Sequence, residues 1–561
     1  MNQKRNTNAV LVGIGALLFL STSCAFQSEH ADLILHNGTI LTMTQSENIP
    51  TVGQAMAIRE GRILEVGKER TILNKYRSAE RTDLRGHVVM PGLIDAHAHF
   101  LGFAEGLTQV NLVGTDSWRA VLEDVEDFAK SSPLPWIQGR GWDQNDWVLP
   151  EWPNRSALDS LFPDRPVVLE RVDGHALIAN GVALRAAGID KGMQVPGGEI
   201  MVDARGELTG VLVDEAMEWV KRVIPPLDSA TRIGALQEAE SQLFEMGITS
   251  VVDAGLGVDD LTFLEKAYAA GHLRIRTWAW ASDTPESHDY WLHRGILDAG
   301  HFTVKGFKFY LDGALGSRGA ALLEPYADRP DWSGLELEGD LDAVLNRFRK
   351  LHDAGFQVAT HAIGDRANRI ALGLYGKVLG GVNDKRWRIE HAQVVAKEDI
   401  PLFAKHSIIP SVQPTHATSD MYWAGLRLGR NRLGRAYAYK NLQGALGMLA
   451  LGTDFPVEDI DPRKTFYAAV ARRDSQGKPK GGFLMDQALM PSDALLGMTL
   501  WAALASFEED DLGTLEPGKI ADIVVVDRNW LAVTPEEVLE SITVGTMLSG
   551  KWVFQDYTRL Q

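Results

Sequence analysis

The two ends of the chain share one pattern, in which short apolar runs are separated by turn residues. Near the N-terminus, Asn37-Gly38 and Glu60-Gly61 interrupt such runs, as turn dipeptides do in β-hairpins. The same texture returns only in residues 521–554. We therefore predict a composite β-sandwich that takes its strands from residues 31–87 and 510–557.

Between these ends, apolar strands alternate with helical stretches, which favours βα units around a parallel sheet. Eight such strands can be recognised, the number that closes a (β/α)8 TIM barrel. We predict an α/β fold in which residues 88–509 form this barrel. The predicted barrel strands lie near residues 88–97, 249–253, 276–281, 306–311, 357–361, 388–391, 408–413 and 449–454.

The barrel region is longer than such a barrel requires, since about 250 residues are typical. The surplus must therefore lie in insertions. The longest gap separates the first and second predicted strands, and it is rich in Trp, Gly and Pro. We predict an insertion at about residues 131–215 that forms a subdomain or a lid over the mouth of the barrel.

Residues 1–24 have the parts of an export signal, with a basic start, an apolar run at 9–20 and small residues before Cys24. Twelve apolar residues span roughly 18 Å as a helix, which is short of a hydrocarbon core about 30 Å thick. Cys24 is the chain's single cysteine, so it has no disulfide partner in the chain. The segment resembles a bacterial lipoprotein signal, which implies export and a lipid anchor on Cys24. The alternatives are secretion with cleavage after Ala25, or a plain N-terminal anchor.

Composition is that of a folded, enzyme-sized protein, with 45% apolar and 23% charged residues. The formal net charge is −18, and a chain of this sign repels a phosphate backbone. We therefore expect no nucleic-acid partner. The partners we expect are a small-molecule substrate and, through the anchor alone, a membrane; a homo-oligomer is left open.

Several predicted barrel strands end on residues that can bind a metal ion. His97 and His99 are two positions apart, so on an extended strand both rings project from one face and can meet one ion. His361 and His391 end the fifth and sixth strands, and Asp454 ends the eighth. Because the carboxyl ends of the strands form the active site of such barrels, we expect these side chains to converge there.

With these motifs the chain resembles the amidohydrolase superfamily, in particular the branch that includes N-substituted formamide deformylases. The resemblance covers nearly all of residues 32–554. The matching motifs lie at residues 91–99, 305–314, 360–365, 390–392, 452–454 and 513–522.

The resemblance implies a site with two metal ions. His97 and His99 would bind the first ion, and His361 and His391 would bind the second. Lys308 would bridge the two ions as a carbamate formed from CO2. The modification makes chemical sense, because a lysine amine with a pKa near 10.4 is a poor ligand, whereas a carbamate is an anionic ligand with two oxygens.

By the same resemblance, Asp454 would contact the first metal and the nucleophilic water. Two ions about 3.5 to 4 Å apart polarise a substrate carbonyl and lower the pKa of bound water, and Asp454 can pass the proton to a leaving nitrogen. Imidazole and oxygen ligands suit Zn, with other divalent ions as alternatives. We predict that metal-bound hydroxide hydrolyses a C–N bond in an amide-like or cyclic-amide small molecule.

Two other functions stay open at this point. The same site would serve a deaminase or an ester or lactone hydrolase, because metals and base do not distinguish these leaving groups. A protein of another class, a non-catalytic binding protein of the cell surface, could also use such a barrel.

Further residues near the motifs are candidates for substrate binding, and each has a plain structural alternative. His175 and Trp142 stand in predicted loops, and Asp312 is part of an Asp-Gly turn. Gln413 and His416 stand where a helix can start. Each of these residues can serve packing alone. Asp365 and Glu390 flank predicted ligands and are candidates for fixing imidazole tautomers. The candidate substrate-binding residues are His175, Asp312, Arg318, Gln413, His416 and Trp142.

Overall fold

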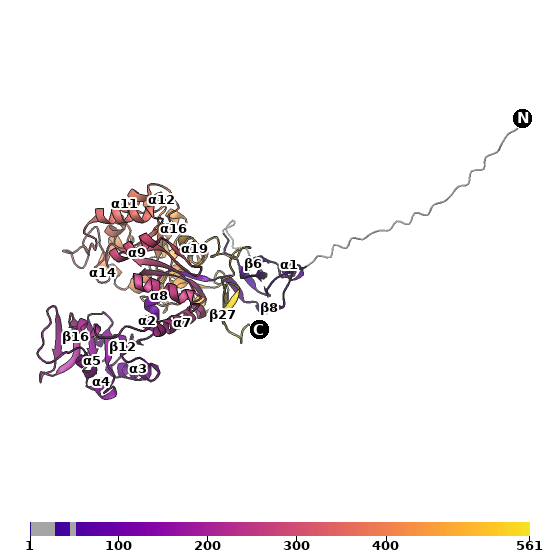
Figure 1. Ribbon diagram of the computed structural model, residues 1–561. Coiled ribbons are helices and arrows are strands. Elements are labelled where there is room, and N and C mark those ends of the chain that lie inside the picture. The colour runs from indigo at the N-terminus through magenta and orange to yellow at the C-terminus, as the bar shows by residue number, and fades with distance from the viewer. Residues whose placement is uncertain (2–27, 45–51, 561) are drawn as a thin grey trace.

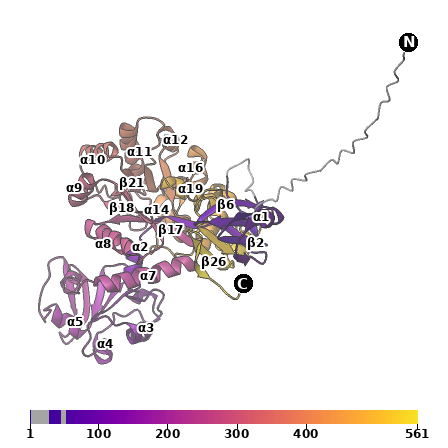
Figure 2. The same cartoon turned by 45° about the vertical axis from the view of Figure 1, so that its right-hand side comes forward.

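A computed structural model describes residue 1, residues 28–44 and residues 52–560. The predicted export signal with Cys24 therefore lies outside the described residues. Figures 1 and 2 show three bodies, namely a central barrel, a domain of strands beside it and a separate lobe next to α2 and α7. Among the described helices, none is both long and apolar enough to cross a membrane.

Eight parallel strands form a nearly closed barrel, which confirms the predicted fold class. Neighbouring strands pair in sequence order around it, and the short β19 (Leu297–Asp298) adds an antiparallel pairing to one of them. In order the barrel strands are β10 (Leu93–Ala98), β17 (Ile248–Leu256), β18 (Arg276–Ser282), β20 (Phe302–Tyr310), β21 (Gln357–Ala362), β22 (Arg388–His391), β23 (Ile409–Val412) and β24 (Ala450–Leu451).

Several helices around the barrel begin with a side-chain cap and bury one apolar face. In α10, for example, the Asp340 carboxylate accepts the N–H of Ala343 at the start, and Val344, Phe348 and Leu351 recur on the buried face. The helices of this body are α2 (Phe100–Gly106), α7 (Ser229–Glu245), α8 (Val258–Ala269), α9 (Pro285–Arg294), α10 (Leu341–Asp353), α11 (Asp365–Leu379), α12 (Ile400–Lys405), α13 (Pro414–Asp420), α14 (Ala424–Leu428), α15 (Arg430–Leu433), α16 (Tyr439–Leu446), α17 (Pro462–Ala471), η2 (Met485–Gln487), α18 (Pro491–Gly497) and α19 (Leu500–Ala505).

Both chain ends supply the strands of the adjoining domain, whose two larger sheets have the orders β6-β5-β2-β8 and β27-β26-β25-β9-β3-β4, while β1 and β7 pair in a third, two-stranded sheet. Apolar side chains of the two sheets share one core, for example Met56 and Ile58 with Ile523 and Val525. The elements are β1 (Glu29–His30), β2 (Leu33–His36), β3 (Thr39–Leu41), β4 (Val52–Gly53), β5 (Ala55–Arg59), β6 (Arg62–Gly67), α1 (Glu69–Lys75), β7 (Tyr76–Arg77), β8 (Glu80–Asp83), β9 (Val88–Pro91), β25 (Ile523–Val526), α20 (Pro535–Leu539), β26 (Thr543–Leu548) and β27 (Lys551–Gln555).

The segment predicted as the first barrel strand, residues 88–97, is in fact two strands in two bodies. β9 pairs antiparallel with β25 in the strand domain, and the barrel begins only with β10. Gly92 lies between them, where an added Cβ would approach Thr249 Oγ1 to 2.3 Å. The absence of a side chain lets the strand pass tightly from one sheet into the other.

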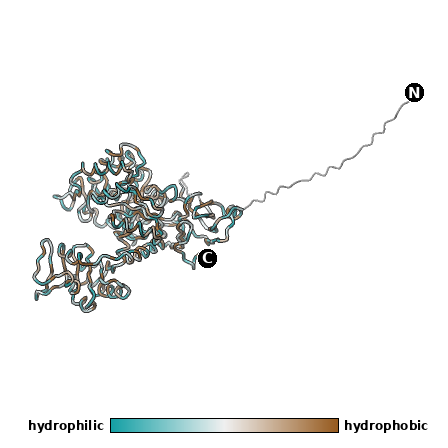
Figure 3. The backbone as a smooth tube through the Cα atoms, in the orientation of Figure 1, coloured by the Kyte–Doolittle hydropathy of each residue, from teal (hydrophilic) through white to brown (hydrophobic). Residues whose placement is uncertain are grey.

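The insertion is a lobe with its own sheet, of order β11-β12-β13-β14-β16-β15. The sheet begins at Val110, earlier than the predicted residue 131, and Figure 3 shows apolar stretches inside the lobe as well as the barrel. Within the described chain, no hydrogen bond or ion pair joins residues 110–221 to the barrel. Its elements are β11 (Val110–Asn111), α3 (Trp118–Ser131), β12 (Ile137–Trp142), η1 (Gln144–Asp146), α4 (Ser156–Leu161), β13 (Val167–Arg171), β14 (Ala176–Ala179), α5 (Gly181–Ala186), β15 (Gly198–Val202), β16 (Leu208–Asp214) and α6 (Met217–Lys221).

Candidate active site

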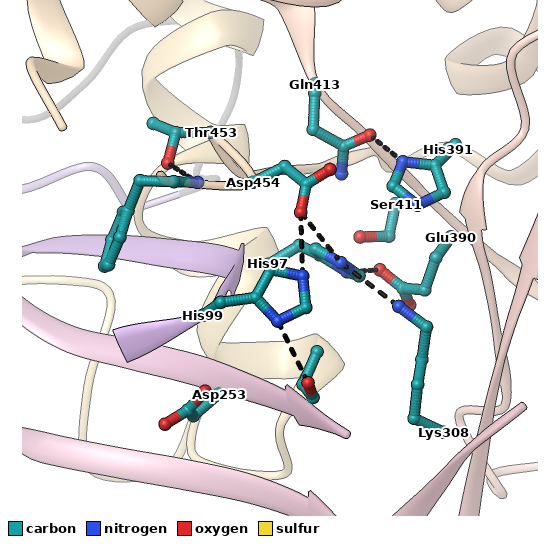
Figure 4. Close-up of polar contacts among 12 residues, drawn as sticks. His97, His99, Asp253, Lys308, Glu390, His391, Ser411, Gln413, Thr453 and Asp454 are labelled. Atoms are coloured by element: carbon teal, nitrogen blue, oxygen red, sulfur yellow. Dashed lines mark hydrogen bonds and ion pairs between the residues drawn. The ribbon is translucent and has the colours of Figure 1, made fainter. Parts of the chain in front are cut away.

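A cluster of histidine and aspartate side chains lies at the carboxyl ends of the barrel strands. One ligand atom each from His97, His391 and Asp454 lies within 4.8 Å of the others, and all three side chains are buried. They come from β10, β22 and the turn after β24, as Figure 4 shows. The barrel thus brings together three residues that are far apart in the sequence.

His99 and Lys308 border this cluster. His99 Nε2 lies 3.1 Å from Asp454 Oδ1, and Lys308 Nζ lies 3.2 Å from His97 Nε2. The Lys308 side chain is buried, and Nζ also lies 5.0 Å from the centre of the Tyr310 ring. The lysine amine of β20 therefore lies beside His97, which another strand of the barrel, β10, carries.

His361 lies beside the cluster, but its Nε2 lies near Asp312, which is not one of the three clustered residues. The centres of the His361 and His391 rings are 4.6 Å apart, whereas His361 Nε2 lies 3.5 Å from Asp312 Oδ1. That nitrogen is buried and has no hydrogen-bond partner among the described residues. His361 is thus close to the three clustered side chains without belonging to their cluster in this conformation.

Two of the clustered side chains belong to residues with a left-handed backbone conformation. His391 and Asp454 have φ angles of 72° and 64°, in the left-handed region that costs most residues roughly 1 to 2 kcal/mol. Asp95 supports the same place, because its carboxylate accepts the N–H groups of His97 and Thr453 and the Thr453 hydroxyl. These bonds hold the end of β10 against the turn that carries Asp454.

The protonation states suit metal binding. Burial lowers the pKa of His97 to about 4 and that of His361 to about 3, and burial also lowers the pKa of His391 well below its usual value. Burial would raise the pKa of Asp454, but the neighbouring side chains of His99, His97 and His391 hold it well below its usual value. The site therefore combines neutral imidazoles with an ionised carboxylate.

The arrangement of donors and acceptors fits a divalent cation. His99 Nδ1 donates to the Ala254 carbonyl at 3.1 Å, so its Nε2 directs a lone pair toward Asp454 Oδ1. Asp454 Oδ1 and His416 Nε2 are both buried without a hydrogen-bond partner in the described part of the chain. Unpaired buried acceptors are unfavourable, and a cation among them would satisfy them.

Three predicted substrate-binding residues lie close to the cluster. Gln413 Oε1 accepts a hydrogen bond from His391 Nδ1 at 2.7 Å, and His416 Nε2 lies 3.7 Å from Asp454 Oδ2. Asp312 is buried, and its carboxylate accepts the N–H groups of three residues, Ala321, Ile363 and Gly364. Gln413 therefore fixes the orientation of the His391 ring, and Asp312 anchors the loops around His361.

The other three predicted residues have partners elsewhere. Arg318 forms a bidentate ion pair with Asp328 in the loop after β20. His175 is exposed in the lobe, and its Nδ1 lies 2.9 Å from Asp214 Oδ1. Trp142 is fully buried in the core of the lobe, where its indole N–H donates to the Leu169 carbonyl.

Three further side chains support the clustered residues, and the sequence pointed to only one of them, Glu390. Glu390 does contact an imidazole, but that of His97 across the barrel and not that of its neighbour His391. Asp365 accepts the Leu323 N–H and contacts no histidine. Asp95 and Arg388 carried no recognisable signal, because an acid or arginine within an apolar strand has no spacing that reveals its partner.

Comparisons with known proteins found similar sequences and structures over most of the chain. A family model described as "Amidohydrolase family" (Amidohydro_3) matches residues 80–554. The chain is 35% identical to "Protein LONG AFTER FAR-RED 3" of Arabidopsis thaliana, over 93% of this chain and 92% of that protein. It is 25% identical to "N-substituted formamide deformylase" of Arthrobacter pascens, over 92% and 97%. An uncharacterized metal-dependent hydrolase from Pyrococcus horikoshii has a similar structure, with a TM-score of 0.75, 30% identity, and coverage of 90% and 99%.

Proposed function

The chain belongs to the amidohydrolase family, and on this premise we propose that it is a metal-dependent hydrolase of a C–N bond in an amide-like or cyclic-amide small molecule. The observation that carries the proposal is the cluster of His97, His391 and Asp454 at the carboxyl ends of the barrel strands. The similarity to a formamide deformylase supports the type of bond.

In this proposal His97, His391 and Asp454 would hold a divalent ion, zinc by preference, with His99 beside it. When bound, the ion would supply charge that polarises a substrate carbonyl and acidifies water. Asp454, kept ionised by its neighbours, would accept a proton from the attacking water and return it to the leaving nitrogen. Gln413 Oε1 accepts a hydrogen bond from His391 Nδ1, so the proton of the neutral His391 ring is on Nδ1. Its Nε2 therefore carries a lone pair.

A carbamate on Lys308 is a further part of the proposal and would permit a second ion near His361. What supports it is the environment of the amine. Burial lowers the pKa of Lys308 to about 8, and the uncharged amine is the form that reacts with CO2. Electron density at Nζ, in protein prepared with bicarbonate and zinc, would show the added carboxyl group; a bare amine beside an occupied metal pair would contradict it.

The lobe has the properties of a lid, which we propose closes the barrel mouth when substrate binds. Two apolar residues after β12, Val148 and Leu149, are 90% and 71% exposed. At the mouth, Leu337 and Val457 are also exposed, and the Val457 N–H donates to the carbonyl of Asp454. Contact between these surfaces would remove apolar area from water and exclude solvent from the site.

We also propose that the protein lies outside the cytoplasm and carries a lipid anchor on Cys24. It rests on the sequence of residues 1–24 alone. The partner that matters for function is then a small molecule that reaches an exported enzyme.

A substrate screen tests the reaction. Purified protein with measured zinc content is incubated with N-formyl, N-acyl and cyclic amides, and with amines, esters and lactones as competing classes. We expect turnover of an amide class, and we expect Asp454→Asn, which removes both a metal ligand and the base, to abolish it. Turnover confined to amines, esters or lactones would replace C–N amide hydrolysis by the corresponding alternative. Full activity in metal-free protein would exclude the metal-dependent mechanism.

A further inference from the structure

Beneath the candidate site, the interior of the barrel contains a buried ion pair. Arg388 and Glu390 both have fully buried side chains, and both come from β22. Arg388 Nε donates to Glu390 Oε1 at 2.7 Å, and Arg388 Nη2 donates to Oε2 at 3.0 Å. Such barrels are usually filled by branched apolar side chains, and a buried ion pair is on average no more stabilising than an apolar pair of similar size. Its presence here calls for a reason other than stability.

The carboxylate of this pair also reaches across the barrel to a candidate metal ligand. Glu390 Oε2 accepts a hydrogen bond from His97 Nδ1 at 2.5 Å, as Figure 4 shows. An ionised carboxylate can only accept, so the proton of a neutral His97 is on Nδ1. The lone pair on His97 Nε2 then faces Lys308 and Asp454.

Arg388 fixes the carboxylate in this position. Besides its two bonds to Glu390, Nη2 donates to the Ala96 carbonyl and to Ser411 Oγ, both at 2.6 Å. The guanidinium also lies over the Trp280 ring, 4.5 Å from its centre. Bonds to β10 and β23 and this aromatic contact leave the pair little freedom to move.

We propose that Arg388 and Glu390 are positioning residues that orient His97 for metal binding. The inference rests on the proposed function and deepens it. A single strand, β22, then supplies one ligand directly through His391 and sets the tautomer of a second through Glu390. Without the carboxylate, His97 could turn or carry its proton on Nε2, where it would oppose a metal ion.

The test replaces the pair without leaving a buried charge. In the double variant Arg388→Met/Glu390→Leu, apolar side chains of similar size fill the space, which is often neutral or stabilising, but His97 Nδ1 loses its acceptor. The matched control is Arg276→Met/Asp522→Leu. That pair is also buried, with Arg276 Nε 2.6 Å from Asp522 Oδ2, and it joins the start of β18 to the strand domain.

Zinc affinity is measured by competition with a chromophoric chelator, and folding by circular dichroism and thermal unfolding of the metal-free proteins. We expect the first variant to stay folded and to bind zinc about 10 to 100 times more weakly, while the control keeps the wild-type affinity. Equal zinc affinity in wild type and first variant would overturn the inference. Equal losses in both variants would also overturn it, because the effect would then be one of general structure.

Two further results keep the test decisive. If the double variant does not fold, Glu390→Leu takes its place, with Asp522→Leu as its control and the same expected loss of zinc affinity, because leucine offers His97 Nδ1 no acceptor. A wild-type protein with no zinc affinity would overturn the proposed function, and this inference with it. That result is distinct from wild-type binding that the substitutions leave unchanged.

Discussion

Replacement of Lys308 by methionine should change how stability depends on pH. The Lys308 side chain is only 1% exposed, and no carboxylate in the described residues forms an ion pair with it. Burial lowers its pKa from 10.5 to about 8, which corresponds to about 3 kcal/mol against the charged form in the folded state. Methionine has a similar length and carries no charge, so this penalty disappears in Lys308→Met.

The direction of the pH dependence follows from the number of protons that Lys308 binds in the folded and in the unfolded state. Between pH 8 and 10.5 the unfolded chain holds a proton on Lys308 that the folded protein has lost, so the free energy of unfolding rises with pH in this window. The gain for the wild type is up to about 3 kcal/mol relative to Lys308→Met, which lacks this titration. Below pH 8 the difference between the two proteins should be constant, with the variant the more stable.

Urea unfolding of the metal-free proteins from pH 7 to 10, in buffer freed of CO2, measures this difference. Lys350→Met, which removes an exposed lysine of α10, is the control and should follow the wild type. Parallel stability curves for wild type and Lys308→Met across the whole range would refute the reasoning, because they would mean that the buried amine keeps its ordinary pKa.

Three other measurements test separate parts of the molecule. Asp312→Asn should lower the free energy of unfolding in urea by about 2 to 4 kcal/mol, because an amide cannot accept all three N–H bonds of the carboxylate; an unchanged value would show that the loops do not depend on it. Cys24→Ser should move the protein from the membrane to the soluble fraction of its host, and an unmodified Cys24 in the mature wild type, seen by mass spectrometry, would disprove the anchor. In the Cys24→Ser background, Leu149→Cys combined with Val457→Cys should form a disulfide if the lobe closes, and a pair that stays reduced under oxidising conditions with ligand present would count against a lid.

Local patterns were sufficient to identify the barrel and most of the candidate ligands. Each barrel strand is a short apolar run, and the repeated alternation of strands with helices specifies a parallel sheet closed by eight strands. His361 and His391 follow such runs, so their position at the carboxyl end of the barrel comes from the strand order alone. The family resemblance then assigned roles to these positions, and the match over residues 80–554 confirms the family.

Tertiary structure alone decided which groups meet. Residues 88–91 have the pattern of a barrel strand, yet they pair with β25 from the other end of the chain. Trp142 could have faced a substrate, but the core of the lobe encloses it. Glu390 precedes His391 in the sequence and nevertheless bonds to His97. Periodicity reports which face of an element a side chain occupies, whereas its partner depends on how the sheets curve and close, and that geometry arises from contacts between segments hundreds of residues apart.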